Sequence, residues 1–201
     1  MSPGLRRTKG LRVKRALFEA AIALFQEKGF DATSVDEIAE RAGFSRATFF
    51  NHFKTKDGVL RFYGEHLRAQ VEAAMLAVGP GAGPMHRLRV VLHTLTREAE
   101  LHRAEARFVY LHSSGDAGYL AKPSPARQHL FELMQVQVAE AQQAGQIRTD
   151  LPAWELAFLV ASLIQMAALA VVMAGRSAES MSEITWQMIC GGVYGGNAVA
   201  P

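Results

Sequence analysis

The side chains best suited to chemistry in this 201-residue chain are basic ones, and they are concentrated near the N-terminus. Residues 1–15 contain six Lys or Arg and no Asp or Glu. Residues 1–60 hold 11 of the 22 basic residues but only 7 of the 19 acidic ones. Such an excess attracts polyanions, so the sequence predicts a polyanion partner. A charged tail that only keeps the protein in solution has the same composition, and that alternative stays open.

A second group of polar side chains occupies residues 45–56. If Ser45 caps a short helix, the residues that point at least partly outward are Arg46, Ala47, Thr48, Phe50, Asn51 and His52. Lys56 falls at the start of the next predicted helix, where the helix dipole disfavours a cation. A nearby phosphate would offset that cost, and we find no reason in folding alone for a lysine at this position.

The sequence lacks the usual patterns of a metal site or an enzyme. His93, His102 and His112 form no His-x3-His pair, and Glu98 with His102 is typical of an exposed helix pair. Cys190 is the only cysteine, which excludes an internal disulfide and a Cys-based zinc cage. We find no Gly-x-Ser-x-Gly elbow, phosphate loop or dinucleotide fingerprint. We therefore expect no catalytic activity, no cofactor and no metal.

The elements that position these residues are predicted to be helices throughout, because apolar residues recur at helical spacing and no alternating strand pattern of useful length occurs. Glycine- and proline-rich breaks fall at 79–84 and 115–125. Asp150 is expected to cap a helix that has Pro152 in its first turn. The predicted helices are 11–28, a short one after Ser34, another after Ser45, about 20 residues from 56, 85–101, 103–113, 125–144, about 151–175 and 180–194.

The two short helices are predicted to form a helix-turn-helix. Ser34 and Glu37 have the spacing of a capping box, and Gly43 suits a turn that needs a positive φ. Ala39 supplies the small residue where the helices cross. The apolar residues Ile38, Phe44 and Phe49 are expected to fix that crossing.

Residues 154–174 are apolar on all sides and long enough to span a bilayer as a helix. Six of the 21 residues are alanine, and the flanks show no clear positive-inside bias. A helix with one face inside the subunit and the other against a partner has the same pattern, and we favour that interpretation.

Four stretches together resemble the DNA-binding domain of the tetracycline-repressor-like (TetR) family over about residues 11–60. They are Ala16 to Ala21, Leu24 to Val35, Ile38 to Ser45 and Thr48 to Lys56, and their order and spacing are specific. Gly145 to Pro152 is similar to the entry of the family's eighth helix. The middle of the C-terminal region resembles nothing that we can name.

The resemblance implies that the helix after Ser45 lies in the major groove of DNA. Arg46, Thr48 and Asn51 would then contact base edges, and Ala47 could touch a thymine methyl group. Phe50 stands where the family usually has a tyrosine, so the hydroxyl contact to the DNA backbone is lost. The residues expected at phosphates are Ser34, Ser45, His52 and Lys56, the two serines also acting as helix caps.

The fold class predicted is all-α, with an N-terminal three-helix helix-turn-helix domain and a six-helix C-terminal ligand-binding and dimerisation domain. The expected parts are a basic flexible arm at 1–10, the DNA-binding domain at 11–56 and the effector-binding and dimerisation domain at 57–201. The resemblance implies a homodimer through 151–175 and 180–194, with Cys190 in or near the interface. No secretory signal is recognised at the N-terminus, so a cytoplasmic location is expected.

The function expected is a repressor that binds an inverted-repeat operator in double-stranded DNA and is released by a small hydrophobic or amphipathic effector. Composition alone suggests the effector-binding residues, which are Phe62, Phe108, Tyr110, His112, Met134, Phe158, Gln165 and Met166. A constitutive architectural DNA-binding protein without an effector is the alternative. A membrane-associated or enzymatic helical protein is a more distant one.

Overall fold

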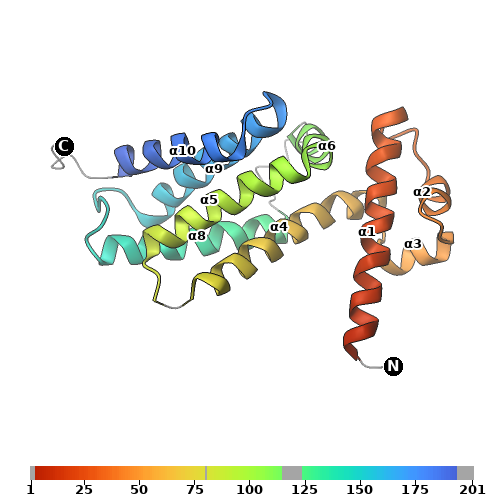
Figure 1. The fold of residues 1–201 in the computed structure, drawn as a ribbon, viewed down its shortest axis with the longest axis horizontal. Helices are drawn as coiled ribbons and strands as arrows, with labels where there is room; N and C mark the ends of the chain where they lie inside the picture. The colour runs from red at the N-terminus through yellow and green to blue at the C-terminus, as the bar shows by residue number, and fades with distance from the viewer. Residues whose placement is uncertain (1–2, 80, 115–123, 194–201) are drawn as a thin grey trace. The chain divides into compact units, whose positions relative to one another are not determined.

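The computed structural model describes residues 3–79, 81–114 and 124–193, and every regular element in these ranges is an α-helix (Figure 1). The helices are α1 (Pro3–Lys28), α2 (Val35–Arg41), α3 (Arg46–His52), α4 (Lys56–Val78), α5 (Pro84–Leu101), α6 (Arg103–Ser114), α8 (Pro125–Gln143), α9 (Ala153–Met173) and α10 (Ala178–Val193). The predicted all-α fold class is confirmed. The predicted break at 115–125 lies largely outside the described residues.

Two local predictions need correction. The helical backbone of α1 begins at Pro3 rather than at residue 11, because proline is favoured in a first helical turn and Leu, Arg and Lys that follow are good helix formers. Asp150 does not cap α9, since Pro152 is the N-cap residue and makes no side-chain cap. Asp150 is held instead by Arg148, whose Nε lies 2.7 Å from Oδ1. That hydrogen bond lowers the pKa of Asp150 and raises that of Arg148.

The first compact unit, residues 1–64, contains α1, α2, α3 and the first turns of α4. Its core is built from α1 residues Leu17, Ala21 and Phe25, which are almost completely buried with Ile38 and Phe49. The two compact units meet within α4, and Val59 and Tyr63 are buried in the first of them. Tyr63 stacks on Phe18 of α1, with ring centroids 6.4 Å apart.

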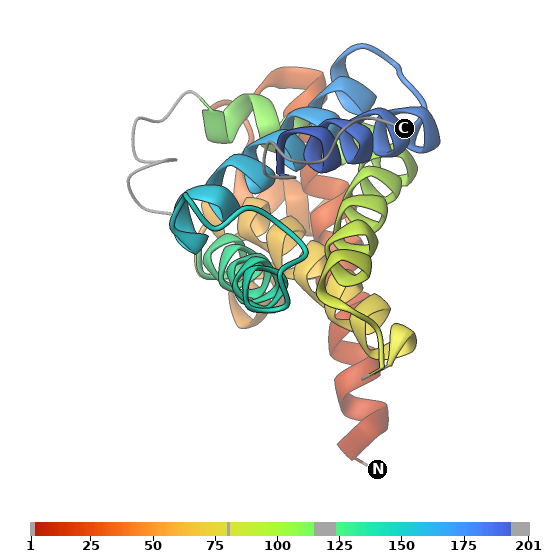
Figure 2. The same cartoon turned by 90° about the vertical axis from the view of Figure 1, so that its left-hand side faces the viewer.

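The second unit, residues 65–201, is a helical bundle organised around α9. Helix α9 packs against α5, α6, α8 and α10. Figure 2 shows the same bundle turned by 90°, with α10 and α8 on different sides of α9. Its core contains Leu92 and Val138, and from α9 it takes Val160, Ile164 and Ala167.

Helix α9 is long and apolar enough to cross a membrane, judged by length and composition. It is a core helix of the second unit, since eight of its residues are buried against neighbouring helices. The structure therefore accounts for its apolar composition by packing.

One face of α9 and α10 nevertheless leaves large apolar side chains exposed. On α9 these are Trp154, Phe158, Leu159, Met166 and Met173, and on α10 they are Ile184 and Met188, all between 43% and 59% exposed. Spacings of four and seven residues place them along one side of each helix. We name these seven residues the apolar stripe.

Candidate nucleic-acid interface

The turn between α2 and α3 is built by local backbone chemistry. Ser34 caps α2 by accepting from the Glu37 backbone at 3.2 Å, and its own backbone N–H donates to the Glu37 carboxylate at 2.8 Å. At the other end, the N–H of Phe44 donates to the carbonyl of Ala39 at 2.8 Å. This closure requires Gly43 at φ 75°, a conformation that glycine adopts without steric cost. The predicted capping box and glycine turn are confirmed.

Helix α3 is oriented by one buried ring. Phe49 is completely buried, while Ser45 caps the helix by accepting from the Thr48 backbone at 3.1 Å. Burial of Phe49 turns the opposite side of this seven-residue helix to solvent. The exposed residues of that side are Arg46, Ala47, Phe50 and Asn51, with Thr48 and His52 half-buried beside them.

The predicted base-contacting residues are thus brought together on one surface of α3. The Thr48 hydroxyl lies 2.9 Å from that of Ser45, so in the free protein it is engaged in the cap. The Arg46 guanidinium lies 5.4 Å from the Phe50 ring centroid, and it pairs with Asp36 of α2 at 2.5 Å. Both members of that pair are about 60% exposed, so exchanging Asp36 for a phosphate or a base costs little.

Phe50 keeps a packing role in the absence of a tyrosine hydroxyl. Its ring is 44% exposed and meets the buried Phe49 edge to face, with centroids 5.5 Å apart. An exposed aromatic ring on a helix surface is available for apolar contact with a partner.

Lys56 has a structural role that the sequence analysis missed. Its ammonium group donates to the carbonyls of Phe30 and Thr33 at 2.8 and 2.9 Å, and to that of Asp31 at 3.4 Å. It also lies 4.6 Å from the Phe30 ring centroid. Folding therefore does explain this lysine, because it satisfies carbonyls in the loop that follows α1. A direct phosphate contact by Lys56 stays a prediction, but one that competes with these hydrogen bonds.

Two of the other predicted phosphate residues are also tied into the first unit. The Ser34 hydroxyl lies 2.7 Å from the Glu37 carboxylate as well as capping α2. His52 lies beside α1, where a Cβ placed on Gly10 would be 3.9 Å from the His52 ring. At that distance a Cβ would make only an ordinary contact with the ring, so glycine is not required for His52 to lie beside α1.

Ion pairs between α1 and α2 join the helix-turn-helix to α1. Arg41 donates two hydrogen bonds of 2.6 Å to Glu27, which lower the pKa of Glu27 and raise that of Arg41. Lys28 donates to Glu37 at the other end of α2. That bond, together with those from Ser34, lowers the pKa of Glu37 from its ordinary 4.5 to about 2. These pairs join residues 9 and 14 positions apart, and sequence spacing alone did not single them out.

Comparison with known proteins identifies this arrangement. Residues 17–61 match the family model described as bacterial regulatory proteins, tetR family. The first unit therefore contains a TetR-type DNA-binding domain. A segment of 57 residues is 40% identical to the HTH-type transcriptional regulator TcmR of Streptomyces glaucescens. That match covers 28% of this chain and 25% of TcmR, so the likeness to this curated relative is confined to about a quarter of its length.

Solved structures extend the likeness to the whole fold. FadR from Bacillus subtilis, in complex with stearoyl-CoA, has a TM-score of 0.76 at 17% identity, with 90% of this chain and 99% of that chain covered. The TetR-family transcriptional repressor FadR from Thermus thermophilus, in complex with lauroyl-CoA, has a TM-score of 0.58 at 27% identity. There the coverage is 94% of this chain and 98% of the other.

The predicted effector residues do not form one group. Phe62 lies in the first unit, where its ring packs edge to face against Phe18 and Phe53 with centroids 5.5 and 5.9 Å away. Phe158 and Met166 are both 54% exposed on the apolar stripe. The structure thus places these three outside the buried core of the second unit, and their contact with an effector stays a prediction.

The remaining predicted effector residues lie on α6, α8 and α9 in the second unit. Phe108 and Met134 are buried, whereas Tyr110 and Gln165 are half-buried. The His112 ring stacks on that of Phe108, with centroids 3.7 Å apart.

A buried polar group inside this unit was not predicted from the sequence. Gln137 of α8 is 4% exposed, and its Oε1 has no hydrogen-bond partner among the described residues. An unsatisfied buried acceptor costs about 1–3 kcal/mol, so such groups are rare in packed cores. No local sequence signal marks Gln137, because its burial depends on how α8 packs.

The lowered pKa of Glu37 predicts acid sensitivity of the helix-turn-helix. Between pH 4.5 and about 2 the unfolded chain binds a proton at Glu37 that the folded chain does not, so stability present above pH 4.5 is lost as the pH falls. The variant Glu37→Gln should be less stable than wild type at pH 7 and should lose less stability between pH 5 and 3. Thermal unfolding at several pH values measures this difference.

The matched control is Glu40→Gln, which alters an exposed carboxylate on the same helix. The stability of this control variant should change with pH as that of wild type does. If the stability of Glu37→Gln also falls as much as that of wild type from pH 5 to 3, the ion pair with Lys28 does not stabilise this unit.

Proposed function

We propose that this chain is a cytoplasmic transcriptional repressor that binds an inverted-repeat operator as a homodimer, and not an enzyme. The observation that carries the proposal is the exposed side of α3, on which Arg46, Ala47 and Asn51 project from a helix whose other side is buried. A helix held this way fits the major groove, where side chains near its start reach base edges. TcmR and the other curated relatives named as HTH-type regulators support this proposal.

The charge of the first unit supports the same partner. Phosphate contacts supply most of the affinity of DNA-binding proteins, and they require basic side chains near the recognition helix. Exposed Lys9 and Arg12 on α1 and exposed Lys54 after α3 belong to this unit. Ser34, Ser45, His52 and Lys56 remain proposed phosphate residues, the first two while also capping helices.

Operator recognition is tested with DNA selected from random sequence. In the resulting complex, Arg46→Ala should cost about 1–3 kcal/mol and relax the choice of base at one position of each half-site. Affinity should also fall steeply as salt rises. Titration of labelled DNA at several salt concentrations measures both effects.

The control for Arg46→Ala is Arg107→Ala, which removes the same charge from an exposed position on α6. It should leave operator affinity and base preference unchanged. Equal loss of affinity in the two variants, on operator and random DNA alike, would contradict a role for Arg46 in reading bases.

We propose that the partner at the apolar stripe is a second copy of this chain. Seven large apolar side chains are exposed on two helices that pack against each other, and exposed apolar patches on soluble proteins mark interaction sites. An inverted repeat requires two-fold symmetry, which one self-complementary surface supplies. Cys190, on the same helix as Ile184 and Met188, is half-buried, and burial raises the pKa of its thiol.

Dimerisation is tested by placing a charge within the stripe. Phe158→Glu should convert a micromolar dimer into a monomer and should weaken operator binding, since a buried unpaired carboxylate is costly. Leu76→Glu is the matched control, because Leu76 is 82% exposed on α4 and lies outside the stripe. Light scattering after size-exclusion chromatography measures the mass. A wild-type monomer, or a Phe158→Glu dimer, would contradict this interface.

We further propose an effector of the acyl-CoA class. The support is the fold shared with FadR proteins bound to stearoyl-CoA and lauroyl-CoA, and the apolar second unit with Phe108, Met134 and the unsatisfied Gln137. An acyl chain suits apolar walls, while the thioester carbonyl of an acyl-CoA can accept from, and its amide N–H groups can donate to, a few buried polar side chains. Tyr110, His112 and Gln165 remain proposed contacts.

The effector proposal predicts release from DNA. Lauroyl-CoA or stearoyl-CoA should lower operator affinity by about 5- to 150-fold, the usual range of coupling between two sites. Free CoA and the matching fatty acid are the controls, and they should lower operator affinity far less. In Gln137→Leu the concentration needed for release should rise. If no acyl-CoA weakens DNA binding, the constitutive DNA-binding alternative is favoured.

A further inference from the structure

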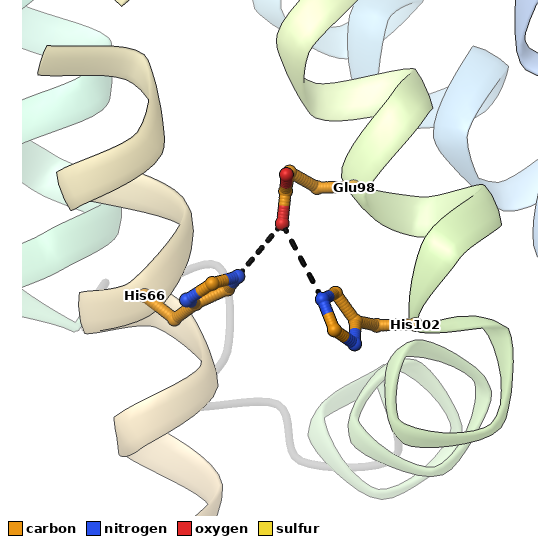
Figure 3. Close-up of side chains that lie close together, drawn as sticks. All are labelled: His66, Glu98 and His102. Carbon is orange, nitrogen blue, oxygen red and sulfur yellow. Dashed lines mark hydrogen bonds and ion pairs between the residues drawn. The ribbon is translucent and has the colours of Figure 1, made fainter. Parts of the chain in front are cut away.

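Three side chains, one from α4 and two from the C-terminal end of α5, meet in the second unit, as Figure 3 shows. His66 lies on α4, Glu98 lies in the last turns of α5, and His102 follows the end of α5. The Nε2 atom of His66 is 2.7 Å from Oε2 of Glu98, and that of His102 is 3.7 Å from the same oxygen. One ligand atom from each residue can be chosen so that all three lie within 4.8 Å of one another.

The local fold explains why two of the three share a side. Glu98 and His102 are four residues apart, which places them on the same face of α5. His102 is the C-cap residue, and its backbone N–H donates to the Glu98 carbonyl at 3.0 Å. The ring of His66 reaches the pair from α4 and meets the His102 ring edge to face, with centroids 5.3 Å apart.

The charge balance of this cluster favours a cation. The side chains of Glu98, His66 and His102 are only 13%, 19% and 23% exposed. The ion pairs that Glu98 makes within the described residues are with these two imidazoles, which carry charge only when protonated. A carboxylate removed from water is costly unless a positive charge faces it, and a bound metal ion supplies that charge.

The donor set indicates which ions fit. Two imidazole nitrogens and one carboxylate oxygen form a common three-ligand set for Zn²⁺ and related first-row ions, whereas Mg²⁺ and Ca²⁺ prefer oxygen ligands. Metal–ligand bonds of about 2.0–2.1 Å in a tetrahedral site put the ligand atoms about 3.3 Å apart. The two distances to Glu98 lie on either side of that value, so small side-chain rotations suffice.

We propose that His66, Glu98 and His102 bind a divalent first-row transition metal ion, with Zn²⁺ as the reference ion. This site differs from the sequence-based expectation of no metal, because it takes a third ligand from α4 that spacing within α5 does not reveal. Three protein ligands leave a coordination position for water or for a donor atom of another molecule. A bound ion joins α4 to the junction of α5 and α6, and so stabilises the second unit.

The test uses the untagged full-length chain, freed of metal with a chelator and studied without DNA or acyl-CoA. Zn²⁺ should bind at one ion per chain in calorimetry and raise the melting temperature. Co²⁺ should give the visible absorption bands of a tetrahedral nitrogen–oxygen site. Mg²⁺ should neither bind nor raise the melting temperature. Because DNA is absent, the outcome does not depend on whether the chain is a repressor.

Variants locate the site. Loss of a residue that only hydrogen-bonds a metal ligand weakens metal binding by about 10- to 100-fold. His102→Gln and Glu98→Gln each remove a direct ligand, so each should weaken Zn²⁺ binding by more than that. His93→Gln, at an exposed histidine of α5, should bind like wild type. Circular dichroism of the metal-free variants shows whether each is folded. No Zn²⁺ binding by the wild type, or binding that survives in a folded Glu98→Gln, His102→Gln double variant, overturns the proposal.

Discussion

The complete burial of Phe49 is the constraint on which the surface of the first unit depends. Helix α3 has seven residues, which is too short for a helix to persist in water by itself. Its rotation is therefore set by the side chain that it buries, and its start is fixed by Gly43 and Ser45. With those positions fixed, the side of α3 that carries Arg46, Ala47 and Asn51 faces solvent.

The local features of this unit could be predicted because they depend on neighbours in the sequence. A capping box joins residues three apart, and a positive φ at Gly43 depends on the turn alone. The pairing of Arg46 with Asp36 and the carbonyls held by Lys56 could not be predicted, because they join residues 10 to 26 positions apart. Helical periodicity tells which side of a helix is apolar, but it does not tell which charged side chains meet.

In the second unit, too, local features could be predicted from the sequence and contacts between helices could not. Its helix ends were predicted to within about three residues, since apolar spacing and glycine or proline breaks are local. Whether Phe158 is a pocket wall or part of an exposed stripe depends on which face of α9 is covered. Gln137 and the cluster of His66, Glu98 and His102 depend likewise on packing among helices. The sequence thus predicted the framework of this unit but not its polar interior.

The central claim, that the exposed side of α3 reads two half-sites of DNA, is tested most directly by affinity cleavage. In a Cys190→Ser background, a DNA-cleaving iron chelate is attached to the cysteine of the variant Ala47→Cys. The control carries the same chelate on the cysteine of Ala104→Cys, at an exposed position of α6. The account predicts two symmetric groups of cuts for Ala47, centred about one helical turn of 34–36 Å apart or a multiple of it. Cuts that are absent, unpaired, or no stronger than those from Ala104 would contradict it.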